Sequence, residues 1–135
     1  MSLKYEENVK DCDLNGYIEH EDRIAFRYVF KDIEDERNFL PINVLNPENI
    51  EKFGCPGWAL SFYSDLNKAK KRYSTILSDR PKAYKKLGTY LANGILQKAD
   101  GISNKEEDSG HYSHYEYIDV ELKSKFSIID ELKKI

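Results

Sequence analysis

The stretch RIAFRYVFK, residues 23–31, decides how the chain is expected to fold. A large apolar or aromatic side chain stands at every second position from Ile24 to Phe30, and Arg27 lies between two of them. Successive side chains of a strand point to opposite faces of the sheet, so this period of two is typical of a strand. The pattern therefore predicts a strand with one buried face.

The segments that follow add further extended stretches. Residues 39–45 are predicted to form a second strand, and Pro41 favours an edge position because proline has no amide to donate to a ladder. Residues 58–63 form an apolar run that is too short for most helices and fits a buried strand. Two later stretches, 89–97 and the tyrosine-rich 111–118, also predict strands.

Helices are expected in the middle of the chain. Ser64 or Asp65 can cap a helix over residues 66–77, in which the apolar positions fall on one side and the lysines on the other. A shorter helix is predicted over residues 81–88, from a proline suited to the first turn to a glycine suited to the stop. The apolar group after position 125 can end a strand or begin a terminal helix.

The order of these elements predicts an α+β fold, with a mainly antiparallel sheet and two central helices packed on it, in a single domain over residues 1–135. The composition, 40% hydrophobic and 33% charged, is that of a soluble globular protein. No apolar run approaches the roughly 18 residues of a membrane helix. The first residues also lack the apolar stretch of a secretion signal, so we expect a cytoplasmic location.

The two cysteines, Cys12 and Cys55, agree with that expectation. They lie 43 positions apart, which is neither a disulfide framework nor the close spacing of a zinc-binding pair. In a reducing compartment we expect both to be free thiols.

The segment GHYSHYEYID, residues 110–119, contains two of the three histidines. If it is a strand, His111 and His114 point to opposite faces, which argues against a metal site built from both. We predict no metal site. Glu116 shares a face with His114, and an imidazole beside a carboxylate is chemically sufficient for acid–base catalysis. The alternative is a strand face where Glu116 only meets water.

Charge is concentrated in residues 66–86. They contain eight basic residues and one acidic residue, whereas the whole chain carries a net charge of −3. Such a segment attracts an acidic protein surface or a small anionic ligand, and the alternative is the solvated side of an amphipathic helix. No motif of a specific nucleic-acid-binding fold is present. The candidate binding residues here are Lys68, Lys71, Arg72 and Lys82.

Three short pieces resemble the arginine, serine and glutamate strands of the ADP-ribosyltransferases. They are a strand arginine, Arg27, the segment WALSFYSDLNKA with Ser61, and the segment HYEYIDVELKSKF with Glu116. The resemblance implies that Arg27 and Ser61 hold NAD and that Glu116 polarises a ribose hydroxyl. His114 stands where the family has an acidic residue or glutamine, and the motif around the serine is incomplete.

Two function hypotheses therefore stay open. The first is a non-catalytic module that binds an acidic partner or anionic ligand through residues 66–86 and needs no cofactor. The second is a small transferase or nucleotide-processing enzyme that uses Glu116 and His114, with NAD or another nucleotide as cofactor. The sequence does not decide whether the protein is an enzyme, nor its oligomeric state.

Overall fold

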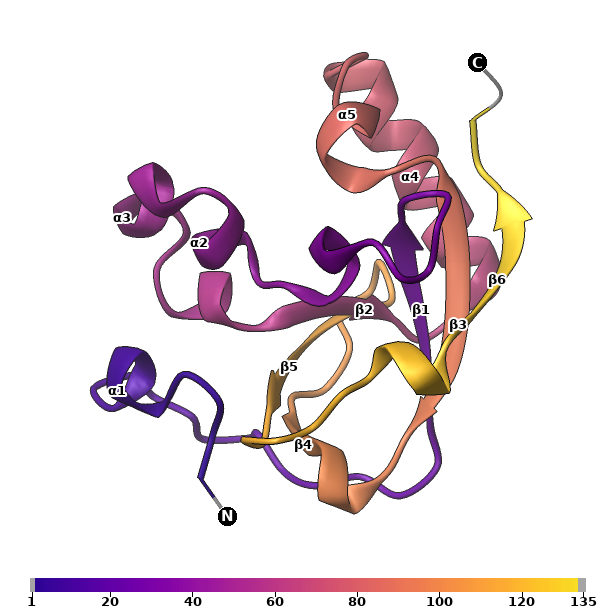
Figure 1. The fold of residues 1–135 in the computed structure, drawn as a ribbon. Helices are drawn as coiled ribbons and strands as arrows, with labels where there is room; N and C mark the ends of the chain where they lie inside the picture. The colour runs from indigo at the N-terminus through magenta and orange to yellow at the C-terminus, as the bar shows by residue number, and fades with distance from the viewer. Residues whose placement is uncertain (1, 134–135) are drawn as a thin grey trace.

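Among residues 2–133, which the computed structural model describes, six strands form one antiparallel sheet in the order β4, β5, β2, β1, β3, β6 (Figure 1). The α+β prediction with a mainly antiparallel sheet is confirmed. The strands are β1 Arg23–Val29, β2 Leu60–Tyr63, β3 Tyr90–Leu96, β4 Gly101–Ser103, β5 His111–Glu116 and β6 Ser127–Glu131.

The longest helix is α4, Leu66–Asp79, which begins after Asp65 because that side chain accepts a hydrogen bond from the Lys68 amide. It packs on the sheet, where the Tyr28 hydroxyl donates to the Ala69 carbonyl at 2.6 Å. The second predicted helix is a single turn, α5 Tyr84–Leu87. No helix within the described range is long and apolar enough to cross a membrane.

The other helical segments are single turns that lie before the first strand or between strands. They are α1 Glu6–Val9, η1 Glu36–Phe39, α2 Ile42–Leu45, η2 Pro47–Asn49, α3 Ile50–Phe53, η3 Cys55–Trp58, η4 Lys98–Asp100 and η5 Lys123–Lys125. The packing of two central helices on the sheet and the single domain stay predictions.

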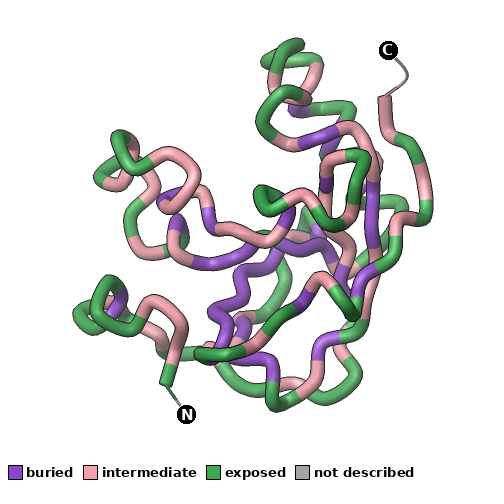
Figure 2. Tube along the Cα trace, in the orientation of Figure 1, coloured by how far each residue is buried: buried purple, intermediate pink, exposed green. Residues whose placement is uncertain are grey.

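Both faces of β1 are covered, which differs from the single buried face that its pattern predicts. Ala25 and Val29 are fully buried in a core shared with β2, β3, β5 and the segment after β5. On the other face Phe26 and Tyr28 are half-buried against α4. Figure 2 shows the buried residues gathered along β2, β5 and β3. The bulkier residues of β1 therefore lie on the less deeply buried face of the sheet.

The ladder between β1 and β2 is short. The two strands pair at one position, Phe26 with Tyr63, whereas β1 and β3 pair over all seven residues. If the ladder continued in this register, Ser61 would lie opposite Tyr28. Instead the strands part beyond the pair, and the segment from η1 to η3 lines one side of the opening.

The prediction of a strand over residues 39–45 is wrong, because the segment contains the helical turn α2. Pro41 stands immediately before that turn, where a missing amide proton costs nothing. The other predicted strands are confirmed in type, although 58–63 begins as η3 and only becomes extended at Leu60. The apolar group after residue 125 is strand β6.

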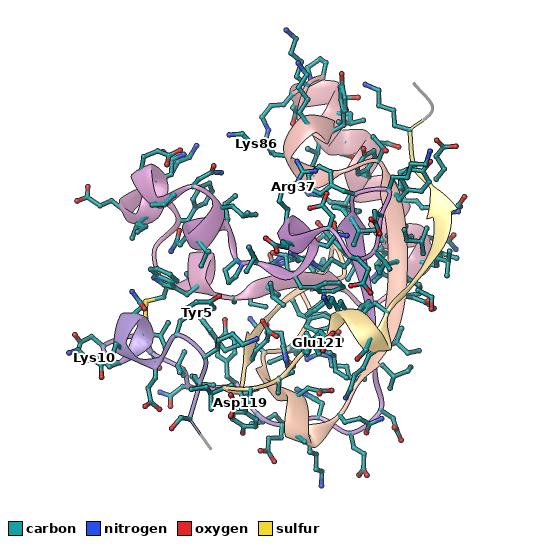
Figure 3. All side chains as sticks on the ribbon, viewed as in Figure 1. Tyr5, Lys10, Arg37, Lys86, Asp119 and Glu121 are labelled. Atoms are coloured by element: carbon teal, nitrogen blue, oxygen red, sulfur yellow. A yellow bond between two sulfur atoms is a disulfide. The ribbon has the colours of Figure 1, made fainter. Side chains whose placement is uncertain are left out.

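Cys12 and Cys55 form a disulfide that ties the segment after α1 to η3 (Figure 3). The expectation of two free thiols is therefore wrong. Their separation of 43 residues in the chain says nothing about their distance in space, and the fold places their Cα atoms 6.0 Å apart. Disulfides are typical of oxidising compartments, so the bond argues against the cytoplasmic location, which stays a prediction.

Candidate functional site

A cavity of about 590 Å³ opens where β1 and β2 part. Its wall includes Arg27 from β1, Ser61 from β2 and Arg72 from α4. Further parts of the wall come from η1 and the segment that follows it, from η3, from α5 and from the loop before β5. This volume lies in the range of small-molecule sites.

Basic residues outnumber acidic residues in the wall of this cavity. Arg27, Arg37, Arg72 and Lys86 come from β1, η1, α4 and α5, and the acidic residue of the wall is Glu107. Arg37 and Lys86 lie near one another in Figure 3. Arg37 already makes a two-point pair with Asp35, at 3.0 and 2.7 Å, so it contributes less to the net potential.

Arg27 joins the two sides of the parted sheet. Its Nη1 donates to the Ser61 carbonyl at 2.9 Å, and its Nε donates to the Asn38 carbonyl at 2.6 Å. Burial lowers the pKa of Arg27 to about 10, against a smaller rise caused by the Glu116 carboxylate. The guanidinium therefore keeps its charge at neutral pH.

A chain of hydrogen bonds lies along one wall of the cavity. The Ser61 Oγ is 2.9 Å from Nε2 of His111, and Nδ1 of the same ring is 2.8 Å from Oε1 of Glu107. Ser61 and His111 belong to the paired strands β2 and β5, and Glu107 lies in the turn that precedes β5. All three side chains belong to residues of the cavity wall.

Three of the residues predicted from sequence meet in this cavity, namely Arg27, Ser61 and Arg72. Lys71 and Lys82 are exposed and lie outside the wall. Lys68 also lies outside the wall, although its side chain packs within 3.2 Å of the Cβ position of Gly110.

The two histidines of β5 point to opposite faces of the sheet, as strand geometry predicts. His114 is 1% exposed, and its Nε2 lies 3.3 Å from the Asp100 carbonyl while its Nδ1 has no partner. Burial lowers the pKa of His114 to about 4, so the ring is neutral at neutral pH. It belongs to the core and not to the cavity wall.

Glu116 is buried on the same face as His114. Its Oε2 accepts from the Lys4 Nζ at 3.0 Å, and burial raises the pKa of this carboxyl against the lowering effects of Lys4 and Arg27. Lys4 also donates to the Val120 carbonyl at 2.7 Å. The N-terminal segment therefore covers this carboxylate.

Sequence reasoning did not single out His111, Glu107 or Arg37 as functional residues, and Lys86 entered it only as part of the basic segment 66–86. For His111 and Glu107 a local signal existed, since they stand four residues apart around a glycine turn before a strand. Within residues 2–133 no group of three or more histidine, cysteine, aspartate or glutamate side chains is placed to hold a metal ion.

Comparisons of the chain with protein-family models, with curated proteins and with solved structures find no match. The geometry of the cavity is therefore the basis for assigning a function.

The low pKa of His114 predicts a pH-dependent stability. Between its usual value of 6.5 and about 4, the unfolded chain binds a proton at this position that the folded chain excludes. The free energy of unfolding should therefore fall by roughly 3 kcal/mol as the pH drops through this window. Denaturant unfolding from pH 7 to pH 4 measures the fall.

The matched variant is His114→Gln, which does not titrate. Asp100, Arg23 and His20 also influence the pKa of His114, and the raised pKa of Glu116 makes stability change with pH in the opposite direction. The quantity compared is therefore the slope of unfolding free energy against pH in the wild type and in the variant. The variant should lose less stability than the wild type on acidification. Equal slopes would show that His114 is not held neutral by the fold.

Proposed function

We propose that the protein binds a small anionic ligand in the cavity between β1, β2, α4 and α5. The observation that carries this proposal is the convergence of Arg27, Arg37, Arg72 and Lys86 on one concave space. A solvated helix face accounts for cations along one helix, but these four come from four separate elements. Asp35 offsets the charge of Arg37, so the repulsion that a bound anion would relieve is mainly that among Arg27, Arg72 and Lys86.

The chemistry of the wall indicates the type of anion. Guanidinium groups present several donors in one plane, which suits the oxygens of phosphate and carboxylate groups. The aromatic rings of Tyr28 and Tyr63 add apolar surface beside them. A phosphorylated or carboxylated small molecule fits this combination better than a flat acidic protein surface, because the cations lie around a hollow.

Two double variants with equal charge loss test the proposal. Arg72→Gln with Lys86→Gln removes two cavity cations, and Lys71→Gln with Lys85→Gln removes two exposed cations from the same region of the chain outside the wall. With inorganic pyrophosphate as the probe in calorimetric titration, the cavity variant should bind roughly tenfold or more weakly. The control variant should bind like the wild type.

Equal weakening in both double variants would assign the effect to the overall charge of the surface and contradict a cavity site. Absence of pyrophosphate binding by the wild type would contradict it as well. Circular dichroism melting of all three proteins establishes that they are folded at the titration temperature.

A second candidate function is an NAD-dependent transferase that uses Glu116. The observation that favours it is the position of Arg27, which donates to the Ser61 carbonyl and lowers the pKa of the Glu116 carboxyl through its charge. These are the three residues on which the resemblance to ADP-ribosyltransferases rests, although the side chains of Ser61 and Glu116 lie on opposite faces of the sheet. In this function Lys4 must leave Glu116 before the carboxylate can reach a ribose hydroxyl.

Titration with NAD, followed by measurement of nicotinamide release, tests the second candidate. Glu116→Gln should preserve NAD binding and reduce nicotinamide release by at least roughly a hundredfold, since it keeps the shape and removes the charge. Pyrophosphate binding without NAD binding would support the anion site and end the transferase proposal.

A further inference from the structure

The chain of hydrogen bonds from Ser61 through His111 to Glu107 contains the parts of an activated nucleophile. The two distances, 2.9 Å from the hydroxyl to the ring and 2.8 Å from the ring to the carboxylate, both lie within the range of direct hydrogen bonds. A nucleophile, a base and a group that orients the base are the three roles of such a site.

The donors and acceptors determine in which direction each hydrogen bond from Ser61 to Glu107 is donated. An ionised carboxylate can only accept, so Nδ1 of His111 carries the proton that it donates to Glu107. In the neutral imidazole Nε2 then has a free lone pair, and the Ser61 hydroxyl donates its proton to it. The serine oxygen is therefore hydrogen-bonded to a base that can remove its proton.

The backbone holds these groups in place from two sides. Ser61 and His111 lie on the same face of neighbouring antiparallel strands, in the register that pairs Tyr63 with His111. The turn that carries Glu107 is closed by hydrogen bonds from the Glu107 amide to the His111 carbonyl and from the Gly110 amide to the Glu107 carbonyl, both 2.8 Å. The Tyr63 ring packs edge-on against the imidazole at 5.6 Å between centroids.

The exposure of Ser61 to the cavity distinguishes these hydrogen bonds from purely structural ones. Ser61 is exposed at the cavity wall and His111 is half-buried, whereas His114 on the same strand is enclosed by the core. A molecule inside the cavity can therefore reach the serine oxygen. Arg27 holds the backbone carbonyl of the same serine, so the residue is fixed by its main chain and by its side chain.

We infer that Ser61, His111 and Glu107 form a hydrolytic site for carboxylic esters that bear a negatively charged group. Ser61 and His111 are the catalytic residues, and Glu107 is a positioning residue for the imidazole. The requirement for a negative charge on the ester rests on the proposed anion site, whereas the nucleophile itself does not.

The reaction balances with water as the second reactant. The Ser61 oxygen attacks the ester carbonyl carbon and its proton passes to Nε2 of His111, which gives a tetrahedral intermediate with the negative charge on the former carbonyl oxygen. Collapse of this intermediate breaks the carbon–oxygen bond, and the departing alcohol takes the proton from His111. Water then attacks the acyl-serine ester and His111 removes a proton from it. The acid leaves, and the proton returns to Ser61.

A fluorophosphonate probe tests the nucleophile independently of any substrate. The serine oxygen forms a bond to phosphorus as the phosphorus–fluorine bond breaks, and intact-protein and peptide mass spectrometry locate the adduct. The wild type should be labelled at Ser61. Ser61→Ala should lose the label, His111→Gln should label at least roughly a hundredfold more slowly, and Ser78→Ala on the exposed side of α4 should label normally.

The pH profile of labelling in Glu107→Gln tests whether Glu107 positions the imidazole, because a purely structural role would leave that profile unchanged. The substitution should slow labelling and change its pH profile, because the imidazole loses the charge that fixes its tautomer. Unlabelled wild-type protein, an adduct on another residue, or equal labelling of the wild type and His111→Gln would overturn the inference. Circular dichroism establishes whether each variant is folded. If His111→Gln fails to fold, His111→Asn takes its place in the comparison.

Hydrolysis of 4-nitrophenyl acetate and of 4-nitrophenyl hemisuccinate tests the substrate class. The second ester carries a carboxylate, and the wild type should hydrolyse it with at least a tenfold higher kcat/KM. Arg72→Gln with Lys86→Gln should remove this preference, whereas Lys71→Gln with Lys85→Gln, outside the wall, should keep both the preference and the fluorophosphonate labelling of Ser61. Labelling at Ser61 without any preference for the charged ester would support the nucleophile and contradict the anion site, so the two failures are distinguishable.

Discussion

Arg27 binds the two segments that flank the point where the β1–β2 ladder stops. The β1–β2 ladder stops after the pair Phe26 with Tyr63, and Arg27 supplies the donor that the Ser61 carbonyl lacks once the strands part. The same guanidinium donates to the Asn38 carbonyl, so it also fixes the segment that lines the other side of the cavity. Without Arg27 both carbonyls would lose a charged donor, at a cost of about 1–3 kcal/mol for each one left buried and unpaired.

The parted strands create the features from which the proposals are built. Between them lies the cavity, and the cations of α4 and α5 reach it because those helices lie beside the same opening. On β2 and β5, which stay paired, Ser61 and His111 keep a common face toward that space. One interruption in a regular ladder thus brings an anion site and a hydrogen-bonded serine together.

Local sequence patterns predicted the regular elements better than the site. Alternation and helical spacing identified β1, β3, β5 and α4, because each of these patterns is set within one segment. The strand predicted over residues 39–45 was wrong, because a short apolar run is compatible with a strand and with a helical turn such as α2. The disulfide depends on a contact between distant segments, which spacing in the chain does not reveal.

The same distinction applies to the cavity. Arg27, Ser61 and Arg72 were each identified from sequence, but their convergence depends on the parting of β1 and β2, which no local pattern encodes. His111 was expected to point away from His114, and it does so. Its hydrogen bond to Ser61, which lies diagonally across the β2–β5 ladder, depends on the strand register and not on either segment alone.

Hydrogen–deuterium exchange of the wild type and of Arg27→Met measures most directly whether this arginine stabilises the two segments whose carbonyls it binds. Methionine keeps an unbranched side chain and removes every donor. The account predicts that amide exchange accelerates at least tenfold in residues 38–45 and 59–61, while the amides of the β3–β6 pair keep their rates. Unchanged exchange in both segments, or equal acceleration throughout the sheet, would contradict it.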